Sequence, residues 1–390
     1  MKLTFVSNFI NHHQAYLADE FYALLGSDFA FVCTERIAPE FQKYVDFKYA
    51  DRPYLLNSYL SDLELSLALQ LCSDSDVVVI GSAPEKFIEN RLLSNKIVFR
   101  YSERWFKKGD HQAFSPRAWY YIYKNYLRFR NRRHFMLCAS AYTANDVSKF
   151  CAFNNKMFKW GYFPAFREID IIGILNSKTV QTFSIVWVAR LIDWKHPELV
   201  IKLALYLKKK KYDFKIEMYG DGELEFLIRN ELRSLELEEF VKLNNVVNND
   251  EILAILRKSN VLLCTSDRGE GWGVVVNEAM SNGCTVVASH AVGSVPFLIE
   301  NGVEGLVFRS GNSESLNFQV ERLINDRVYC NYLASKAYKK IASLWNPKIA
   351  ATSFLELAES IIIGKEVVPS RGPCSKAYPV RCFYKYNPFK

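Results

Sequence analysis

Two pairs of charged residues in the second half of the sequence have the types and spacing for phosphate and sugar chemistry. Arg190 and Lys195 follow an apolar run at 183–189, and Glu270 and Glu278 lie eight residues apart. Fixed cations bind a nucleotide diphosphate and stabilise the negative charge that grows as it departs. A carboxylate accepts two hydrogen bonds from a vicinal diol, as on ribose or a hexose. Taken alone, the two cations are more typical of a solvated loop.

The residues around the glutamates strengthen the prediction. An apolar run ends at Thr265, a glycine-rich loop follows, and a helix is predicted over 273–282 with Gly283 as its C′ residue. Gly271 and Gly273 let a ligand approach the backbone closely. The unpaired N–H groups at the start of the helix suit a phosphate.

This segment resembles a known family. Residues 270–280, Glu-Gly-Trp-Gly-Val-Val-Val-Asn-Glu-Ala-Met, resemble the E-x7-E signature of the family 4 retaining glycosyltransferases, which have the GT-B fold. The Arg/Lys pair and the turn at 220–222, Gly-Asp-Gly, occur upstream in the family's order. The resemblance spans about 183–309. This second half of the sequence is similar to bacterial capsule and O-antigen polysaccharide transferases. In the first half, only the strand order and residues 140–143 resemble the family.

The resemblance implies a role for each residue. Arg190 and Lys195 would bind the diphosphate and stabilise the leaving group. Glu270 would face the transferred sugar, and Glu278 would hold the ribose hydroxyls. The other expected donor-binding residues are Gly271, Trp272, Gly273, Gly220, Gly293 and Ser294. No metal or cofactor is expected, because the two cations supply the charge that Mg²⁺ supplies elsewhere.

Two further segments are expected near the donor. Residues 290–296 follow a predicted strand and either close over the donor, with Gly293 and Ser294 near the phosphates, or form an ordinary turn. Residues 244–249 are placed near the nucleotide base only by their position in the family's fold.

Apolar, β-branched runs alternate with helical patterns along the chain, which favours parallel sheets with helices on both faces. Strands are predicted at 3–7, 29–33, 77–80, 97–100, 135–139, 183–189, 214–219, 261–265 and 285–289. Further helices are predicted at 15–25, 59–71, 197–210, 222–236, 250–258 and 333–363, the last with a break at Trp345-Asn346-Pro347.

These elements predict an α/β protein with two Rossmann-like domains that face a cleft, where ligands bind beyond the carboxyl ends of the strands. We assign an acceptor-binding domain to 1–165, a linker to 166–182 and a donor domain to 183–340. Helices at 341–363 would cross back to the first domain. The basic tail is assigned to 364–390, and its residues 371–390 would either contact a membrane or be disordered.

The acceptor side is less well defined. Asn8, His12 and His13 follow the first strand, where a neutral histidine would orient or deprotonate an acceptor hydroxyl, or simply cap the next helix. Glu103 is expected to point toward the same cleft. Family members often have a histidine near this place and this sequence has none, which leaves the acceptor-side base open. Ser140 is a weaker candidate.

Positive charge is concentrated in one part of the chain. The net charge is +8, and residues 100–134 hold ten Lys/Arg against two Asp/Glu, a net of +8 by themselves. Ser115 and Pro116 predict a helix start. That helix, to 133, would place Trp119, Ile122, Tyr123 and Tyr126 on one face and Lys124, Arg128 and Arg132 on another. It either lies on an anionic membrane surface or packs within the first domain with a solvated basic face.

Other motifs are interpreted structurally. Asp74-Ser75-Asp76 matches the D-x-D pattern that other glycosyltransferases use for a divalent metal, but it precedes the strand at 77–80, at the end away from the cleft. Nine cysteines without a C-x-x-C pair argue against a zinc or disulfide framework. Cys33, Cys138 and Cys264 lie in apolar runs, where free thiols act as small hydrophobes.

The 390 residues favour two domains, and no apolar run reaches the ~18–20 residues of a membrane span. The apolar start is too short for a secretory signal. We therefore expect a cytoplasmic protein, with peripheral contact to the inner face of the membrane through 100–134 as an option.

The leading interpretation is metal-independent hexosyl transfer with retention. The donor would be a nucleotide diphosphate sugar, a UDP-sugar before a GDP-sugar, and the acceptor a lipid-linked or saccharide molecule in surface polysaccharide biosynthesis. One alternative is a GT-B sugar-nucleotide epimerase or hydrolase, which needs no acceptor surface. Another is a nucleic-acid-binding protein, suggested by the basic stretch but disfavoured by the complete set of donor residues; we expect no nucleic-acid partner. The same set disfavours a catalytically dead scaffold.

Overall fold

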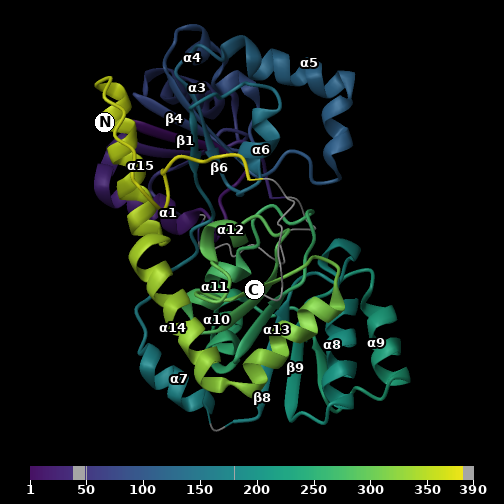
Figure 1. The fold of residues 1–390 in the computed structure, drawn as a ribbon. Coiled ribbons are helices and arrows are strands. Elements are labelled where there is room, and N and C mark those ends of the chain that lie inside the picture. The colour runs from purple at the N-terminus through teal and green to yellow at the C-terminus, as the bar shows by residue number, and fades with distance from the viewer. Residues whose placement is uncertain (38–48, 50, 180, 381–390) are drawn as a thin grey trace. The chain divides into compact units, whose positions relative to one another are not determined.

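The computed structural model describes residues 1–37, 49, 51–179 and 181–380. They form two compact units (Figure 1). The first unit contains Met1–Ala165 and the C-terminal segment that begins at Leu344, and the second contains Phe166–Ser343. Among the described residues, no helix has both the length and the apolar character needed to cross a membrane.

The first unit is built on a parallel sheet of seven strands in the order β3-β2-β1-β4-β5-β6-β7. Its strands are β1 (Leu3–Ser7), β2 (Phe29–Cys33), β3 (Leu55–Asn57), β4 (Val77–Ile80), β5 (Ile97–Ser102), β6 (His134–Cys138) and β7 (Met157–Lys159). Its helices are α1 (Ala15–Leu25), α3 (Asp62–Asp74), α4 (Glu89–Leu93), α5 (Pro116–Asn125), α6 (Thr143–Ser148) and α15 (Pro347–Ile362). Strands β1, β4 and β6 are buried at every position, as expected of parallel strands covered on both faces.

The second unit is built on a parallel sheet of six strands in the order β10-β9-β8-β11-β12-β13. Its strands are β8 (Phe183–Val188), β9 (Phe214–Tyr219), β10 (Val241–Asn244), β11 (Val261–Cys264), β12 (Thr285–Ser289) and β13 (Leu306–Phe308). Its helices are α7 (Ile171–Thr179), α8 (Glu198–Lys209), α9 (Glu225–Ser234), α10 (Asn249–Lys258), α11 (Val275–Ser281), α12 (Val295–Leu298), α13 (Ser313–Asn325) and α14 (Arg327–Leu344).

Both sheets reverse their strand order beside their first strand. In the first unit β1 lies between β2 and β4, and in the second β8 lies between β9 and β11. The loops that leave the carboxyl ends of the two strands at such a point run to opposite sides and leave a crevice between them. The β1/β4 and β8/β11 edges are therefore where this topology positions ligands.

The C-terminal helix α15 belongs to the first unit because of its buried aromatic residue. The ring of Phe354 is fully buried and lies 5.6 Å from Phe21 of α1 and 5.0 Å from Phe99 of β5. Burying one such side chain contributes about 1.5–3 kcal/mol. The predicted break before this helix is confirmed: Asn346 accepts the N–H of Ile349, and α15 starts at Pro347.

The basic helix is shorter than predicted. It begins at Pro116 after Ser115, as expected, but α5 ends at Asn125 rather than near 133. The cause is tertiary: the Arg100 side chain donates to the backbone carbonyl of Asn125 at 3.3 Å and stacks 4.5 Å from the Tyr126 ring. The chain is thereby drawn into the core at the point where the helix would continue.

The predicted aromatic face is not continuous either. Ile122 and Tyr126 are buried, whereas Tyr123 is 61% exposed and Trp119 is 45% exposed. The cations of this segment also differ in their surroundings. Arg128 forms an ion pair with Glu89 at 2.5 Å.

Two other segments correct the predictions. The region read as a linker, 166–182, contains the helix α7. Of the two alternatives predicted for the tail, disorder is wrong for residues up to 380. Cys374 and Ala377 are buried, and their N–H groups donate to Lys159 and Met157 of the edge strand β7 at 2.8 and 3.0 Å. Such pairing covers an exposed sheet edge. The remainder, 381–390, lies outside the described residues.

The thiol prediction is confirmed for the three core positions. Cys33, Cys138 and Cys264 are free and buried, and burial raises the pKa of the Cys33 thiol to about 11. These side chains act as small apolar groups in the core.

Candidate functional site

The switch point of the second unit brings together one member of each predicted charged pair, Lys195 and Glu270. The loop after β8 carries Arg190 and Lys195, and the loop after β11 carries Glu270. Lys195 and Glu270 form an ion pair in which each side chain is 14% exposed. Ser266 donates to the same Glu270 oxygen, Oε2, at 3.1 Å. The site therefore holds a paired cation and carboxylate at the position where the topology places ligands.

A buried hydrogen-bond chain fixes the backbone of Lys195. The indole N–H of Trp187 in β8 donates to the Thr265 hydroxyl at 2.8 Å, and that hydroxyl donates to the Lys195 carbonyl at 2.6 Å. Both Trp187 and Thr265 are 1% exposed. Thr265 therefore supports the site. From the sequence it was predicted only as the last residue of a strand.

Arg190 is exposed at the mouth of the same loop. Its guanidinium carbon lies 6.0 Å from the Trp194 ring, and Lys195 Nζ lies 4.4 Å from that ring. The Trp194 ring therefore contacts both cations of this loop. Two cations in this arrangement are suited to an anion with more than one charge.

Gly220 supports this loop from beneath. Its φ is +147°, and a Cβ there would lie 1.9 Å from the carbonyl oxygen of Ala189. The Leu191 N–H donates to the Asp221 carbonyl at 2.7 Å. The Gly-Asp-Gly turn thus packs directly against the backbone that carries Arg190. Gly220 was predicted as a donor-binding residue, and the structure places it against this backbone.

Glu278 lies in the first turns of α11 and is 4% exposed. The side-chain amide of Asn249, at the start of α10, donates to Glu278 Oε1 at 2.7 Å. Burial raises the pKa of Glu278, and the bond from Asn249 opposes that rise. Asn249 belongs to the segment expected near the nucleotide base, but its contact with Glu278 was not foreseen.

The glycine-rich loop is anchored by its tryptophan. Trp272 is fully buried, its indole N–H donates to Asn277 at 2.8 Å, and its carbonyl accepts the Ser294 N–H at 3.0 Å. Its side chain therefore lies in the core, so that only its backbone is left for the predicted ligand contact. Gly273 has φ +84°, and a Cβ there would lie 2.8 Å from Val292.

In the segment 290–296, residues 290–294 form turns and a bend that lead into α12. Gly293 and Ser294 are buried, and the Ser294 N–H bond ties this segment to the glycine loop. Ser294 Oγ is a buried hydroxyl without a hydrogen-bond partner among the described residues. A buried hydroxyl of this kind is available to an incoming polar ligand.

His196 links the two loops. It has a left-handed backbone, φ +52°, and its ring nitrogens lie 2.8 Å from Glu198 Oε1 and 3.7 Å from Asp267 Oδ2. The Asp267 and Glu198 carboxylates raise the pKa of His196 to about 10. The imidazolium therefore connects the Lys195 loop to the Glu270 loop at neutral pH. No periodic pattern or motif in the sequence predicts this role of His196.

The helix α7, missed as a linker, holds the far end of α11. Lys178 is 2% exposed, and its Nζ donates to the carbonyls of Gly283 and Leu256 at 2.6 and 3.4 Å. Desolvation lowers the pKa of this ammonium group. Gly283 has φ +68° and follows the helix as the predicted C′ residue.

The first unit has a polar cavity of about 440 Å³ at the carboxyl ends of β1, β4 and β5. Asn8 and Glu103, two of the predicted acceptor-side residues, line it. Glu103 accepts the Tyr162 hydroxyl at 2.6 Å and pairs with Lys107 at 2.5 Å. The cavity lies at the switch point of its own sheet, which makes it the candidate acceptor site.

The other acceptor-side candidates lie beside the cavity. His13 stacks on Tyr162 at 5.1 Å and His12 packs on His13 at 3.8 Å, but neither lines the cavity as described. Burial lowers the pKa of His13 well below its usual value. Ser140 is fully buried and accepts the Tyr142 N–H at 3.3 Å, so it supports a turn.

The D-x-D segment lies at the opposite end of the sheet. Asp74 ends α3, and Asp76 accepts the N–H of Lys2, at the amino end of β1, at 2.8 Å. Within the described ranges, no cluster of three or more His, Cys, Asp or Glu side chains is arranged to hold a metal ion.

Comparison with known proteins shows what the second unit is similar to. Residues 176–340 match the model of the glycosyl transferases group 1. The chain is 28% identical over 192 residues to the amylovoran biosynthesis glycosyltransferase AmsK of Erwinia amylovora, covering 48% of this chain and 47% of that protein. It is 26% identical over 167 residues to the poly(glycerol-phosphate) alpha-glucosyltransferase of Bacillus subtilis, covering 43% and 24%. The match thus spans less than half the length of these relatives.

Solved structures show that the fold extends over both units. Anabaena HepE in complex with UDP and glucose superposes with a TM-score of 0.66 at 15% identity, covering 92% of this chain and all of that one. Sucrose-phosphate synthase from Thermosynechococcus elongatus superposes with a TM-score of 0.64 at 12% identity, covering 94% and 100%. Two Rossmann-like parallel sheets with C-terminal helices are the GT-B fold. The part of the chain that matches the group 1 glycosyl transferases, residues 176–340, carries the Lys195–Glu270 pair and Glu278.

Proposed function

We propose that this protein is a retaining family 4 glycosyltransferase that moves a hexose from a nucleotide diphosphate sugar to an acceptor held by the first unit. The observation that carries the proposal is the site at the β8/β11 edge. There a paired Lys195 and Glu270 and a buried Glu278 surround a glycine-rich loop. Each group matches one part of a nucleotide sugar: diphosphate, sugar and ribose.

The donor side explains how the charge of the leaving group is managed. In the free enzyme Lys195 is neutralised by Glu270. A bound diphosphate would take Lys195 as its partner, together with Arg190, and Glu270 would then be free to accept hydrogen bonds from the transferred sugar. Negative charge that develops on the departing diphosphate would meet two fixed cations. This arrangement supports a reaction that needs no divalent metal.

A uracil base is the favoured donor base. HepE was solved with UDP and glucose, and a second solved relative, Staphylococcus aureus TarM, was solved in a complex that contains UDP. Glu278 and Asn249 would hold the ribose of a UDP-sugar or of a GDP-sugar and do not distinguish the two. Because these similar structures contain UDP, UDP-glucose is the first donor to test.

The acceptor is proposed to be a lipid-linked molecule or a saccharide in surface polysaccharide assembly. The named relatives act in amylovoran biosynthesis and on poly(glycerol-phosphate). The first unit exposes aromatic side chains on and beside α5, among them Phe114 at 83% and Tyr120 at 68%. With the neighbouring cations, this surface supports peripheral contact with an anionic membrane.

Product analysis tests the proposal. Purified protein is incubated with radiolabelled UDP-glucose and a membrane lipid extract, with and without EDTA, and the anomeric configuration of the product is read by NMR. We expect label transfer with an α product, unchanged by EDTA. An inverted anomer would contradict retention, and activity restored only by Mg²⁺ or Mn²⁺ would contradict metal independence. Conversion of donor without acceptor would instead support an epimerase or hydrolase.

A further inference from the structure

Two hollows of the first unit share one wall. The polar cavity at the β1, β4 and β5 ends is lined by Tyr121 and Tyr126, and both residues also line a second, open groove of about 810 Å³. Tyr121 and Tyr126 therefore lie at the boundary between the cavity and the groove, and both hollows belong to the first unit.

The groove is apolar and aromatic. Its lining includes Trp105, Phe106, Phe114, Ala118 and Ile122. The rings of Trp105 and Tyr126, which both line the groove, stack with their centroids 4.9 Å apart. Phe114 is 83% exposed and Tyr121 is 51% exposed, so the rim of the groove exposes apolar surface to water. Exposed aromatic surface of this kind marks a site for an apolar partner.

A cation borders this apolar surface, and two further exposed cations lie nearby in the sequence. Arg117 also lines the groove, and Lys108, Arg117 and Lys124 are all exposed. The hydrocarbon that suits the groove would therefore have an anionic neighbour. Charge complementarity singles out an anionic amphiphile as the occupant.

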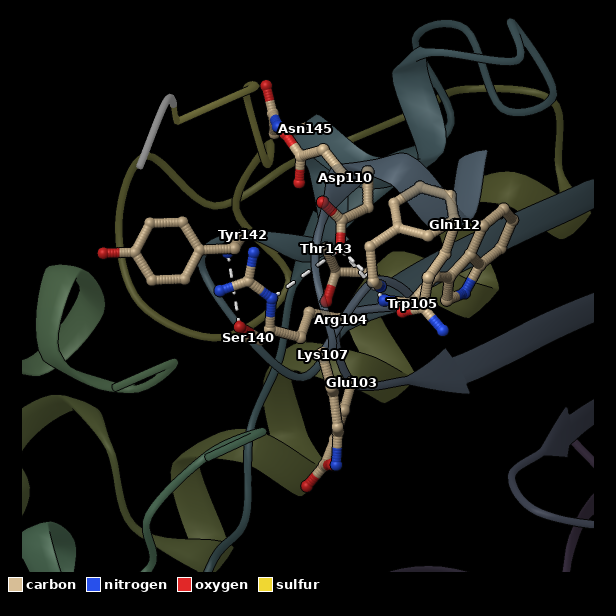
Figure 2. A network of polar contacts seen from close by, with 12 residues as sticks. Glu103, Arg104, Trp105, Lys107, Asp110, Gln112, Ser140, Tyr142, Thr143 and Asn145 are labelled. Atoms are coloured by element: carbon tan, nitrogen blue, oxygen red, sulfur yellow. Dashed lines mark hydrogen bonds and ion pairs between the residues drawn. The ribbon is translucent and has the colours of Figure 1, made fainter. Parts of the chain in front are cut away.

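The polar cavity contains an arginine with two buried N–H groups that form no hydrogen bond among the described residues. Arg104 lines the cavity and is 3% exposed. Its nearest carboxylate, Asp146 Oδ2, is 3.8 Å from Nε, and that oxygen already accepts the N–H groups of Trp105 and Phe106 at 3.0 and 3.2 Å. Arg104 Nε and Nη1 are buried and form no hydrogen bond among the described residues. Figure 2 shows the guanidinium beside Tyr142, whose ring lies 4.9 Å from it.

The carboxylates of the cavity do not compete for Arg104. Glu85 is paired with Arg100 at 2.6 Å, and Glu103 is paired with Lys107 at 2.5 Å. A buried donor that forms no hydrogen bond costs free energy even beside the Asp146 carboxylate, and a guanidinium is suited to the oxygens of a phosphate. A phosphate oxygen in the cavity would supply what Asp146 does not.

We propose that the first unit binds an amphiphilic phosphate as the acceptor, with its phosphate at Arg104 in the polar cavity and its hydrocarbon chain running past Tyr121 and Tyr126 into the apolar groove. The inference rests on the proposed transferase function and selects a lipid-linked acceptor over a free saccharide. It assigns the recognition of the head to Arg104 and that of the chain to the groove.

Binding of n-alkyl phosphates tests the two halves separately. Butyl, hexyl, octyl and decyl phosphate are titrated into the full chain by calorimetry, each below its micellar concentration. Each methylene that enters the groove should tighten binding about fourfold. Ala118→Gln narrows the groove with a neutral, helix-compatible side chain and should abolish this dependence on chain length while butyl phosphate binding is kept. Arg104→Gln should weaken every member of the series at least tenfold.

Controls separate specific binding from detergent-like adsorption and from misfolding. Leu63→Gln alters an apolar residue of α3 that is 69% exposed, and it should leave the series unchanged. Arg104→Lys keeps the charge and reports on the head contact if Arg104→Gln is unstable. Equal chain-length dependence in wild type and Ala118→Gln would overturn the groove, and unchanged affinity in both Arg104 variants would overturn the head site. UDP-glucose binding to the second unit is measured in a separate titration. Absence of that binding would count against the proposed function and not against the acceptor site.

Discussion

Lys195 and Glu270 neutralise each other across two loops of the second unit, each with only 14% of its side chain exposed. The ion pair offsets the cost of holding the Lys195 ammonium and the Glu270 carboxylate away from water. A bound diphosphate would replace Glu270 as the partner of Lys195. The site is therefore suited to a polyanion rather than to a sugar alone. This relationship gives the first prediction.

Lys195→Met should lower kcat for glucosyl transfer about 10²–10³-fold, because one of two fixed charges on the departing diphosphate is lost. Initial rates with radiolabelled UDP-glucose measure the effect. Lys202→Met, an exposed lysine of α8, is the matched control and should stay near wild type. A Lys195 variant within threefold of wild type would remove this residue from the mechanism.

Nucleotide affinity should fall in mild acid because of Glu278. Burial raises the pKa of this carboxyl above its usual value, and only the ionised form accepts two hydrogen bonds from the ribose diol. Asn249→Ala removes a bond that favours the ionised form, so the loss of affinity should begin at a higher pH in that variant. Calorimetric titration of UDP between pH 4.5 and 8 would show this shift. Superimposable pH profiles would contradict the role given to Asn249.

His196 should stabilise the second unit in a pH window set by its shifted pKa. The folded value, about 10, lies above the ordinary 6.5, so the stabilisation is complete below about pH 6.5 and disappears as the pH rises through 10. Because the ring is partly exposed, solvent screening reduces the gain to about 1–2 kcal/mol. His196→Gln should therefore lose this amount in urea unfolding at pH 6 and differ little from wild type near pH 10.5. A difference that does not change with pH would mean that packing, not charge, accounts for it.

Gly220→Ala should be among the most destabilising small substitutions in the second unit. Its Cβ would lie 1.9 Å from a backbone oxygen that cannot rotate away, so we expect a loss of about 3 kcal/mol or more together with reduced donor binding. Gly311→Ala is the control, since its φ is also positive, +73°, but nothing lies within 4 Å of the added carbon. That change should cost only about 1–2 kcal/mol. Equal losses in thermal unfolding would show that the close approach to Ala189 is not what requires Gly220.

The sequence predicted the central strands because each is a short, continuous apolar run bounded by polar turns. Val77–Ile80 and Thr285–Ser289 are examples in which the predicted and observed bounds coincide. It also placed Arg190, Lys195, Glu270 and Glu278 on the loops and helix that the structure assigns to them. Local pattern is sufficient where one segment carries both the strand and the residue that follows it.

What the sequence could not predict depends on contacts between distant segments. The end of α5 at Asn125 follows from the Arg100 side chain, 25 residues earlier in the chain. The support of Lys195 by Thr265 spans 70 residues, and the contact of Asn249 with Glu278 spans 29. The C-terminal tail had a disordered composition, yet its backbone pairs with the edge strand β7. None of these contacts leaves a periodic signal in either partner segment.

The measurement that tests the central claim most directly is thermal unfolding of the wild-type protein and of Glu278→Ala with UDP-glucose, GDP-glucose and ADP-glucose. A ligand at about 100 times its Kd should add ~2.7 kcal/mol of stability, which is a shift of several degrees. The control is Glu238→Ala, a residue whose side chain is 62% exposed. We predict a shift with UDP-glucose in the wild type and in Glu238→Ala that disappears in Glu278→Ala. A shift that survives in Glu278→Ala, or no shift with any of the three donors, would contradict a nucleotide-sugar site at the β8/β11 edge.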